Sequence, residues 1–186
     1  MSDSIDLPDH QMLALPYAAL NALRAALLRD AGATAASDLQ AAGYAGGDAL
    51  FASFNAWLRA HGEPVAEALG LAAFERVATA FFRAAGWGSI EISTLRDLVA
   101  TLDSPDWGEA DPAAASDHPG CHLTTGIFAD FFGRLAGYPV AVLEVECRSA
   151  GDRRCRFLVG NADVMNALYD RMERGAPYDA AVAAMA

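Results

Sequence analysis

Three cysteines and one glutamate occur at intervals that suit a metal ion. The cysteines are Cys121, Cys147 and Cys155, and the glutamate is Glu144. Gly151 lies midway between Cys147 and Cys155, so strands that pair about it would bring these cysteines opposite each other. Directly opposed residues have Cβ atoms about 4.5–5.5 Å apart. Thiolates at that separation can both bind one zinc ion at about 2.3 Å, so the pattern predicts a zinc site on a hairpin.

The spacing leaves alternatives open. Side chains alternate along a straight strand, so Glu144 and Cys147 share a face only if the strand ends or bulges near residues 145–146. Glu146 is a rival carboxylate ligand, and His122 is a rival nitrogen ligand. Cys147 and Cys155 form a disulfide instead if they are oxidised. Each cysteine can also be a plain buried side chain.

Charge favours the metal and limits the partners. The chain has 13 basic and 24 acidic residues, a net charge of -11. We expect no nucleic-acid partner and no binding to anionic membranes, because no basic patch offsets this charge. Basic residues gather instead on the hairpin, where they can neutralise a thiolate-rich centre. They are Arg148, Arg153, Arg154 and Arg156.

The position of the chain in the cell follows from its first residues and its cysteines. The acidic start is not a signal peptide, and no run of 18 apolar residues predicts a membrane span. An odd number of cysteines excludes a complete disulfide framework within one chain. We therefore expect a cytoplasmic protein, with residues 1–14 as a flexible leader and residues 15–186 as one zinc-containing domain.

Periodicity predicts the elements around the hairpin. Apolar residues at helical spacing predict a leucine-striped helix between Pro16 and Gly32, and further helices over residues 38–61, 65–85 and 123–135. Alternation predicts strands over residues 90–93, 98–103, 140–145 and 154–159, with a loop at 105–120. A helix capped by Asn161 or Asp163 and a short one at 178–185 complete the chain. The order predicts an α+β fold, in which an antiparallel four-stranded sheet of two hairpins packs against helices on one face.

Glycines and aromatic residues mark close contacts. Gly43, Gly46 and Gly47 lie within the second predicted helix and allow another helix, or a ligand, to approach closely. Helix packing is the favoured interpretation. The aromatic side chains can be core, or they can line a pocket for a small hydrophobic or aromatic molecule. The candidate lining residues are Phe54, Trp57, Phe81, Trp87, Trp107, Phe128 and Phe132. Trp107 lies in the predicted loop, where core packing explains it least.

The segment from Cys121 to Gly160 resembles the 4-vinyl reductase domain family. The matching pattern is Cys121, 22 residues, Glu144, two residues, Cys147, seven residues and Cys155. The family includes sensory modules of phenol- and xylene-responsive activators, and is similar in fold to transport-particle subunits and nitric-oxide-sensing haem domains. The resemblance implies zinc on these four residues, with Glu144 rather than Glu146. It also implies a homodimer, for which the leucine-striped helix is the candidate interface.

Three functions follow as hypotheses. The first is a stand-alone sensor or carrier of a hydrophobic or aromatic molecule, with a structural zinc ion. The second, suggested by the family, is a (bacterio)chlorophyll-synthesis 4-vinyl reductase component or a tetrapyrrole-binding accessory factor. The third is a dimeric protein-interaction module. No catalytic arrangement and no dinucleotide-binding fingerprint is evident, so the sequence favours binding over catalysis.

Overall fold

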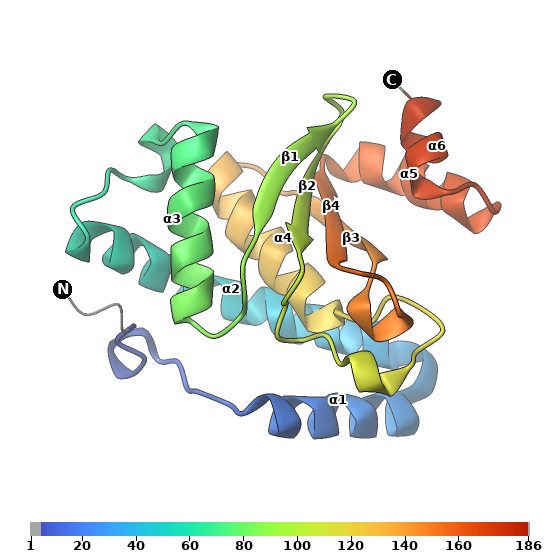
Figure 1. Ribbon diagram of the computed structural model, residues 1–186, viewed down its shortest axis with the longest axis horizontal. Helices are drawn as coiled ribbons and strands as arrows, with labels where there is room; N and C mark the ends of the chain where they lie inside the picture. The colour runs from blue at the N-terminus through green and yellow to red at the C-terminus, as the bar shows by residue number, and fades with distance from the viewer. Residues whose placement is uncertain (1–4, 186) are drawn as a thin grey trace.

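A four-stranded antiparallel sheet and six α-helices make up residues 5–185, which the computed structural model describes (Figure 1). The strands pair in the order β1-β2-β4-β3, so two hairpins lie side by side. The predicted α+β class with two hairpins is confirmed. The elements are α1 (Tyr17–Ala31), α2 (Ala35–Ala60), α3 (Leu71–Ala84), β1 (Glu91–Leu95), β2 (Val99–Ser104), α4 (His122–Ala136), β3 (Ala141–Glu146), β4 (Cys155–Gly160), α5 (Ala162–Glu173) and α6 (Tyr178–Ala183).

One boundary differs from the prediction. The third helix begins at Leu71 rather than at residue 65. A single 3-10 turn, Ala66–Ala68, follows Pro64, and the backbone is extended at Leu69 and Gly70. The extended residues end the first turn before a helix can propagate from it. The turn still buries Ala66 against the core, so this segment serves as a packed connection.

Helices cover both faces of the sheet, and the prediction of a single covered face is wrong. α2, α3 and α4 enclose the larger core on one face, with Leu102 and Phe157 pointing into it. α5 and α6 pack on the other face against Val99 and Leu158 (Figure 1). The strand residues alternate between the two clusters because successive side chains point to opposite faces. No helix among residues 5–185 is long and apolar enough to cross a membrane.

The longest helix, α2, packs closely against α4 through glycines. A Cβ atom on Gly43 would overlap the backbone carbonyl of Leu123, and one on Gly126 would overlap the carbonyl of Gln40. A Cβ atom on Gly47 would overlap the side chain of Asp130. Gly46 points away from any neighbour, with nothing within 4 Å of such an atom. Helix packing therefore explains Gly43 and Gly47, as predicted, but not Gly46.

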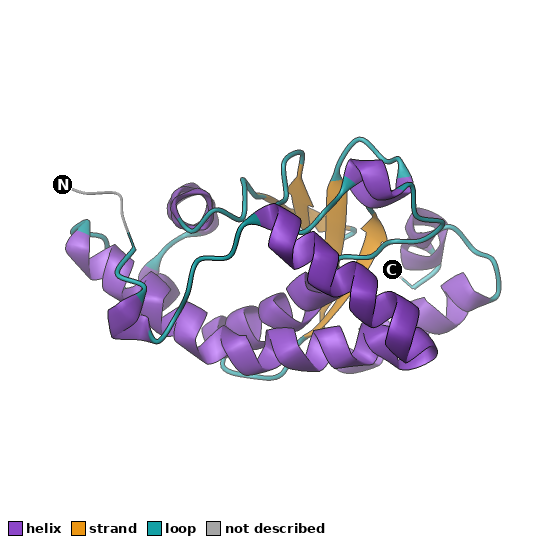
Figure 2. Ribbon diagram, turned by 90° about the horizontal axis from the view of Figure 1, so that it is seen from below, coloured by secondary structure: helices purple, strands orange, loops and turns teal. Residues whose placement is uncertain are grey.

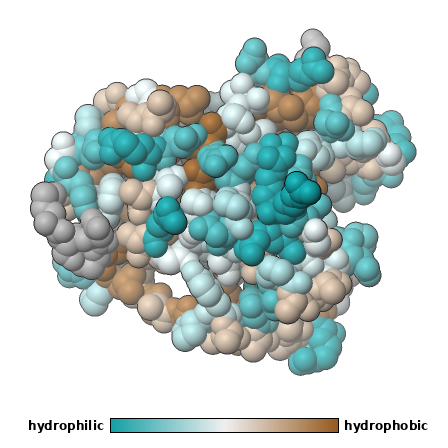
Figure 3. Space-filling view, viewed as in Figure 1, coloured by the Kyte–Doolittle hydropathy of each residue, from teal (hydrophilic) through white to brown (hydrophobic). Residues whose placement is uncertain are grey.

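The first helix docks with its polar side inward. Arg24 is the buried residue of α1, whereas Leu23 and Leu28 are 62% and 43% exposed. Seen from below, α1 crosses in front of the sheet (Figure 2). The lower edge that it forms is largely pale to brown in the space-filling view (Figure 3). The leucine stripe is thus only partly covered by the chain's own core.

Candidate metal centre

A β-bulge brings the four candidate ligands to one face of the sheet. Glu144 pairs with Phe157, but Glu146 pairs with Arg156, so Val145 is an extra residue in β3. The bulge changes which face each later side chain meets. Continuing the register by one residue places Cys147 opposite Cys155, on the same face as Glu144. This resolves the alternation that would otherwise separate Glu144 from Cys147, and it does so where the sequence required a bulge.

The hairpin ends in a turn that glycine permits. Gly151 has a φ of +91°, in the left-handed region that glycine adopts without strain. A short 3-10 turn, Arg148–Ala150, precedes it. Cys147 follows β3 directly, and Cys155 begins β4, so the turn holds both thiols at one end of the hairpin. The third thiol comes from Cys121, the N-cap residue of α4.

The ligand atoms of Cys121, Glu144, Cys147 and Cys155 all lie within 4.8 Å of one another, and all four residues are buried. The sulfur of Cys121 is 3.8 Å from that of Cys147 and 4.0 Å from that of Cys155. These distances exclude disulfides, and the three thiols are free. A tetrahedral ion with metal–sulfur bonds of about 2.3 Å separates its sulfur ligands by about 3.8 Å. The spacing is therefore that of a tetrahedral metal site.

The hydrogen bonds around the cluster also fit a metal ion. One carboxylate oxygen of Glu144 accepts the backbone N–H of Cys121 at 2.7 Å. Its other oxygen, Oε1, is buried without a hydrogen-bond partner. Backbone N–H groups of Gly120 and Arg148 donate to the sulfurs of Cys147 and Cys155. A buried carboxylate oxygen left without a donor is costly, and a cation at the centre of the cluster would satisfy it.

The acidity of the cluster shows the same need for positive charge. Burial, and then the neighbouring Cys147, raise the pKa of Glu144 to about 8. Hydrogen bonds to Cys147 and Cys155, followed by burial, raise the pKa of the Cys121 thiol. The pKa of Cys147 is lowered instead, because the other two thiols donate to it. Four anions cannot share one buried site unless a cation compensates them.

The structure separates the candidate ligands from their rivals. Glu146 faces α6, where it pairs with Arg154 at 2.8 Å and accepts a hydrogen bond from Tyr178 at 2.5 Å. His122 lies beside Cys121 but outside the cluster, and burial lowers its pKa. Asp103 binds Arg154 and Arg156. The expectation that these arginines neutralise the cluster is wrong for Arg154 and Arg156, because the bulge turns their partners to the other face.

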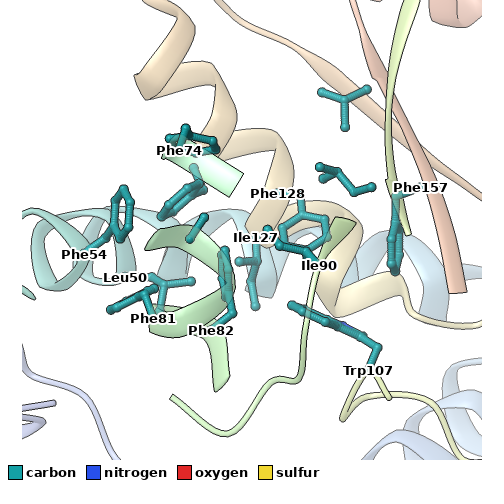
Figure 4. Close-up of a cluster of buried hydrophobic side chains, with 14 of the residues drawn as sticks. Leu50, Phe54, Phe74, Phe81, Phe82, Ile90, Trp107, Ile127, Phe128 and Phe157 are labelled. Carbon is teal, nitrogen blue, oxygen red and sulfur yellow. The ribbon is translucent and has the colours of Figure 1, made fainter. Parts of the chain in front are cut away.

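The seven candidate pocket residues belong to one aromatic cluster on the α2–α3–α4 side of the sheet (Figure 4). The ring of Phe81 lies 5.1 Å from that of Phe54 and 6.3 Å from that of Trp57. Phe128 lies 5.5 Å from Phe132. Trp107 links the rest, at 5.6 Å from Trp87 and 5.1 Å from Phe128. These rings pack against one another as core residues do.

Trp107 is explained by core packing, contrary to the expectation from its place in a loop. It is 1% exposed, and its indole N–H donates to Thr124 Oγ1 at 2.7 Å. The neighbouring Glu109 is fully buried and forms an ion pair with Arg24. Sequence reasoning missed both charged residues, because 85 residues separate them and no local pattern connects them.

The family comparison covers the segment that carries the cluster. Residues 109–161 match the model of the 4-vinyl reductase domain. This chain contains a 4-vinyl reductase segment. The segment begins at Glu109 and includes all four candidate ligands, whereas α1, α2 and α3 lie outside it. The predicted resemblance to the 4-vinyl reductase family is confirmed. No curated protein sequence matches the chain.

Two solved structures resemble the chain that carries the 4-vinyl reductase segment. The phenol-responsive sensory domain of the transcription activator PoxR, solved with phenol, is 18% identical, with a TM-score of 0.62. The match covers 82% of this chain and 77% of that domain, and it shows that the two share a fold. A vinyl-4-reductase family protein from Methanocaldococcus jannaschii is 19% identical over 56% of this chain and 73% of that one, with a TM-score of 0.41.

Proposed function

We propose that Cys121, Glu144, Cys147 and Cys155 bind one structural zinc ion. The buried cluster, with sulfurs at tetrahedral spacing, is the observation that carries this proposal. A thiolate-rich tetrahedral site favours zinc among the common divalent ions. Four protein ligands leave no open position for a reacting water, so the ion joins the start of α4 to the β3–β4 hairpin rather than performing chemistry. Three reduced thiols also suit a cytoplasmic protein.

The whole domain, in this proposal, binds a small hydrophobic or aromatic molecule as a sensor or carrier. The fold is shared with the PoxR sensory domain, which was solved with phenol. The aromatic cluster supplies an apolar setting of the kind that encloses such ligands. A tetrapyrrole is several times larger than phenol, and rings already in mutual contact favour the smaller molecule. Binding within the cluster requires some of these rings to move.

Two buried polar groups indicate where an oxygen of the ligand would be recognised. Ser53 and Trp57 lie one turn apart on the buried side of α2. The hydroxyl of Ser53 and the indole N–H of Trp57 have no hydrogen-bond partner. Buried polar groups are nearly always paired with protein, water or ligand. An aromatic molecule that carries an oxygen acceptor, such as a phenol, would satisfy the indole N–H.

Replacing Trp57 with phenylalanine tests this site. We expect the zinc-loaded protein to bind phenol more tightly than toluene, by calorimetry, and Trp57→Phe to lose about tenfold of that preference, the value of one hydrogen bond. Trp87→Phe is the matched control, because Trp87 stacks on Trp107 at the other end of the cluster. A wild-type protein that binds neither molecule, or a Trp57→Phe variant with an unchanged preference, would contradict the proposed site.

A homodimer through α1 is part of the same proposal. Leu23 and Leu28 leave an apolar stripe exposed on the helix, which is unusual for a surface helix that already docks through a buried arginine. We expect the protein to sediment as a dimer and Leu23→Glu to sediment as a monomer with an unchanged melting temperature. Ala25→Glu on the same helix is the control for added charge. A monomeric wild-type protein would refute this part of the proposal.

A further inference from the structure

Helix α1 touches the metal-bearing segment through one buried arginine. Arg24 Nη1 donates to the backbone carbonyl of Glu109 at 2.6 Å, and Nη2 donates to the carbonyl of Gly120. Its Nε lies 3.1 Å from Glu109 Oε1, close enough for an ion pair although not aligned as a hydrogen bond. A guanidinium has the rigid fork of donors that such a bridge requires. Arg24 thus joins two loops that are distant in sequence.

Gly120 connects this arginine to the cluster within a single residue. Its carbonyl accepts from Arg24, and its N–H donates to the sulfur of Cys147. The next residue is Cys121, whose backbone N–H donates to Glu144. A shift of Gly120 would therefore disturb three of the four candidate ligands. The arginine holds the outer side of this peptide, and the cluster holds its inner side.

Glu109 fixes the other end of the same segment. Its carboxylate accepts the backbone N–H of Leu123 at 3.1 Å and that of Thr124 at 2.7 Å. The hydroxyl of Thr124 also donates to it, at 2.5 Å. A carboxylate at these positions satisfies free N–H groups in the first turn of α4 and opposes the helix dipole favourably. The buried Arg24–Glu109 pair therefore fixes residues 120–124 on both sides of Cys121.

We propose that Arg24 is a positioning residue of the metal centre, acting from outside the 4-vinyl reductase segment. It rests on the proposed zinc site. Arg24 and Glu109 hold the Cys121 sulfur where the other three ligands can share an ion with it. Outer partners that orient metal ligands in this way typically contribute about 10–100-fold in metal affinity. Linkage makes the effect reciprocal, so the bound ion stabilises the docking of α1 by the same factor.

Zinc affinity, measured by competition with a chromogenic chelator, tests the inference. We expect Arg24→Met to lower the affinity by about 10–100-fold. Arg29→Met is the matched control, because Arg29 lies on the same helix, exposed, and pairs only locally with Asp30. We expect it to bind zinc as the wild type does. Absorption of the cobalt-loaded proteins gives a second reading, since thiolate charge-transfer bands should weaken in Arg24→Met alone.

Hydrogen exchange tests the reciprocal effect. In the zinc-loaded wild type, α1 amides should exchange slowly. They should exchange faster at a chelator concentration that removes part of the zinc, beyond any change in α5 amides. Arg24→Met should show fast α1 exchange whether or not zinc is bound. Arg24→Lys keeps the charge beside Glu109 but cannot bridge two carbonyls, so it serves for the affinity test if Arg24→Met does not fold.

The outcomes separate this inference from the proposed function. A wild-type protein that binds no zinc refutes the zinc site, and the role of Arg24 with it. A wild type that binds zinc, with equal affinity in the Arg24 and Arg29 variants, overturns the role of Arg24 and leaves the zinc site standing. Exchange of α1 that does not respond to zinc in the wild type also overturns it.

Discussion

Replacing Cys155 with alanine is expected to abolish stoichiometric zinc binding and to lower the melting temperature by about 6–12 °C. The lower temperature corresponds to a loss of about 3 kcal/mol in a protein of this size, a modest part of what structural zinc contributes to small domains. The sulfur of Cys155 lies 4.0 Å from that of Cys121, at one corner of the cluster. Without it, three ligands remain, and the ion gains an open position that water fills.

Mass spectrometry of the metal and differential scanning calorimetry measure both effects. Glu146→Gln is the matched control in the same hairpin, because Glu146 contacts Arg154 and Tyr178 rather than the cluster. Its partly exposed ion pair contributes about 1 kcal/mol or less, so this variant should keep its zinc with a small loss of stability. Zinc retained in Cys155→Ala, or lost in Glu146→Gln, would show that the cluster is not the metal site.

The comparison of these two glutamates shows how far the sequence determines the site. Alternation alone assigned Glu144 and Cys147 to opposite faces, and the family pattern favoured Glu144 over Glu146. The bulge at Val145 reconciles the two, because it reverses the alternation between Glu144 and Cys147. A bulge follows from the register of two strands and has no signature in either strand. The requirement for one was predictable, and its position at 145–146 was predicted from the chemistry of the ligands.

Other features depend on contacts that no local pattern encodes. The helices and strands followed from periodicity because each element buries one face. Arg24 and Glu109 are paired by the path of α1 across the sheet, which depends on the packing of the whole chain. The same path explains why α1 buries its polar side. The second cluster under α5 and α6 was missed because buried alternation in a strand does not reveal how many faces are covered.

Substitution of Gly43 by alanine is expected to destabilise the protein by about 3 kcal/mol, near the upper end of typical overpacking. The added methyl would meet the backbone carbonyl of Leu123, which cannot turn aside as a side chain could. α2 and α4 must then separate. Gly46→Ala is the control on the same helix, where the added methyl meets nothing, and it should stabilise by up to about 1 kcal/mol because alanine favours helix.

The same substitution at three glycines also separates packing from metal binding. Leu123 lies two residues after Cys121, so Gly43→Ala should weaken zinc binding as well as folding. Gly47→Ala meets Asp130, two turns further along α4, and should reduce stability while leaving zinc affinity unchanged. Urea unfolding and chelator competition measure the two quantities independently. If Gly43→Ala and Gly46→Ala were equally stable, the close contact of α2 with α4 would be wrong. If Gly43→Ala lost stability but kept full zinc affinity, the first turn of α4 would not be what positions Cys121.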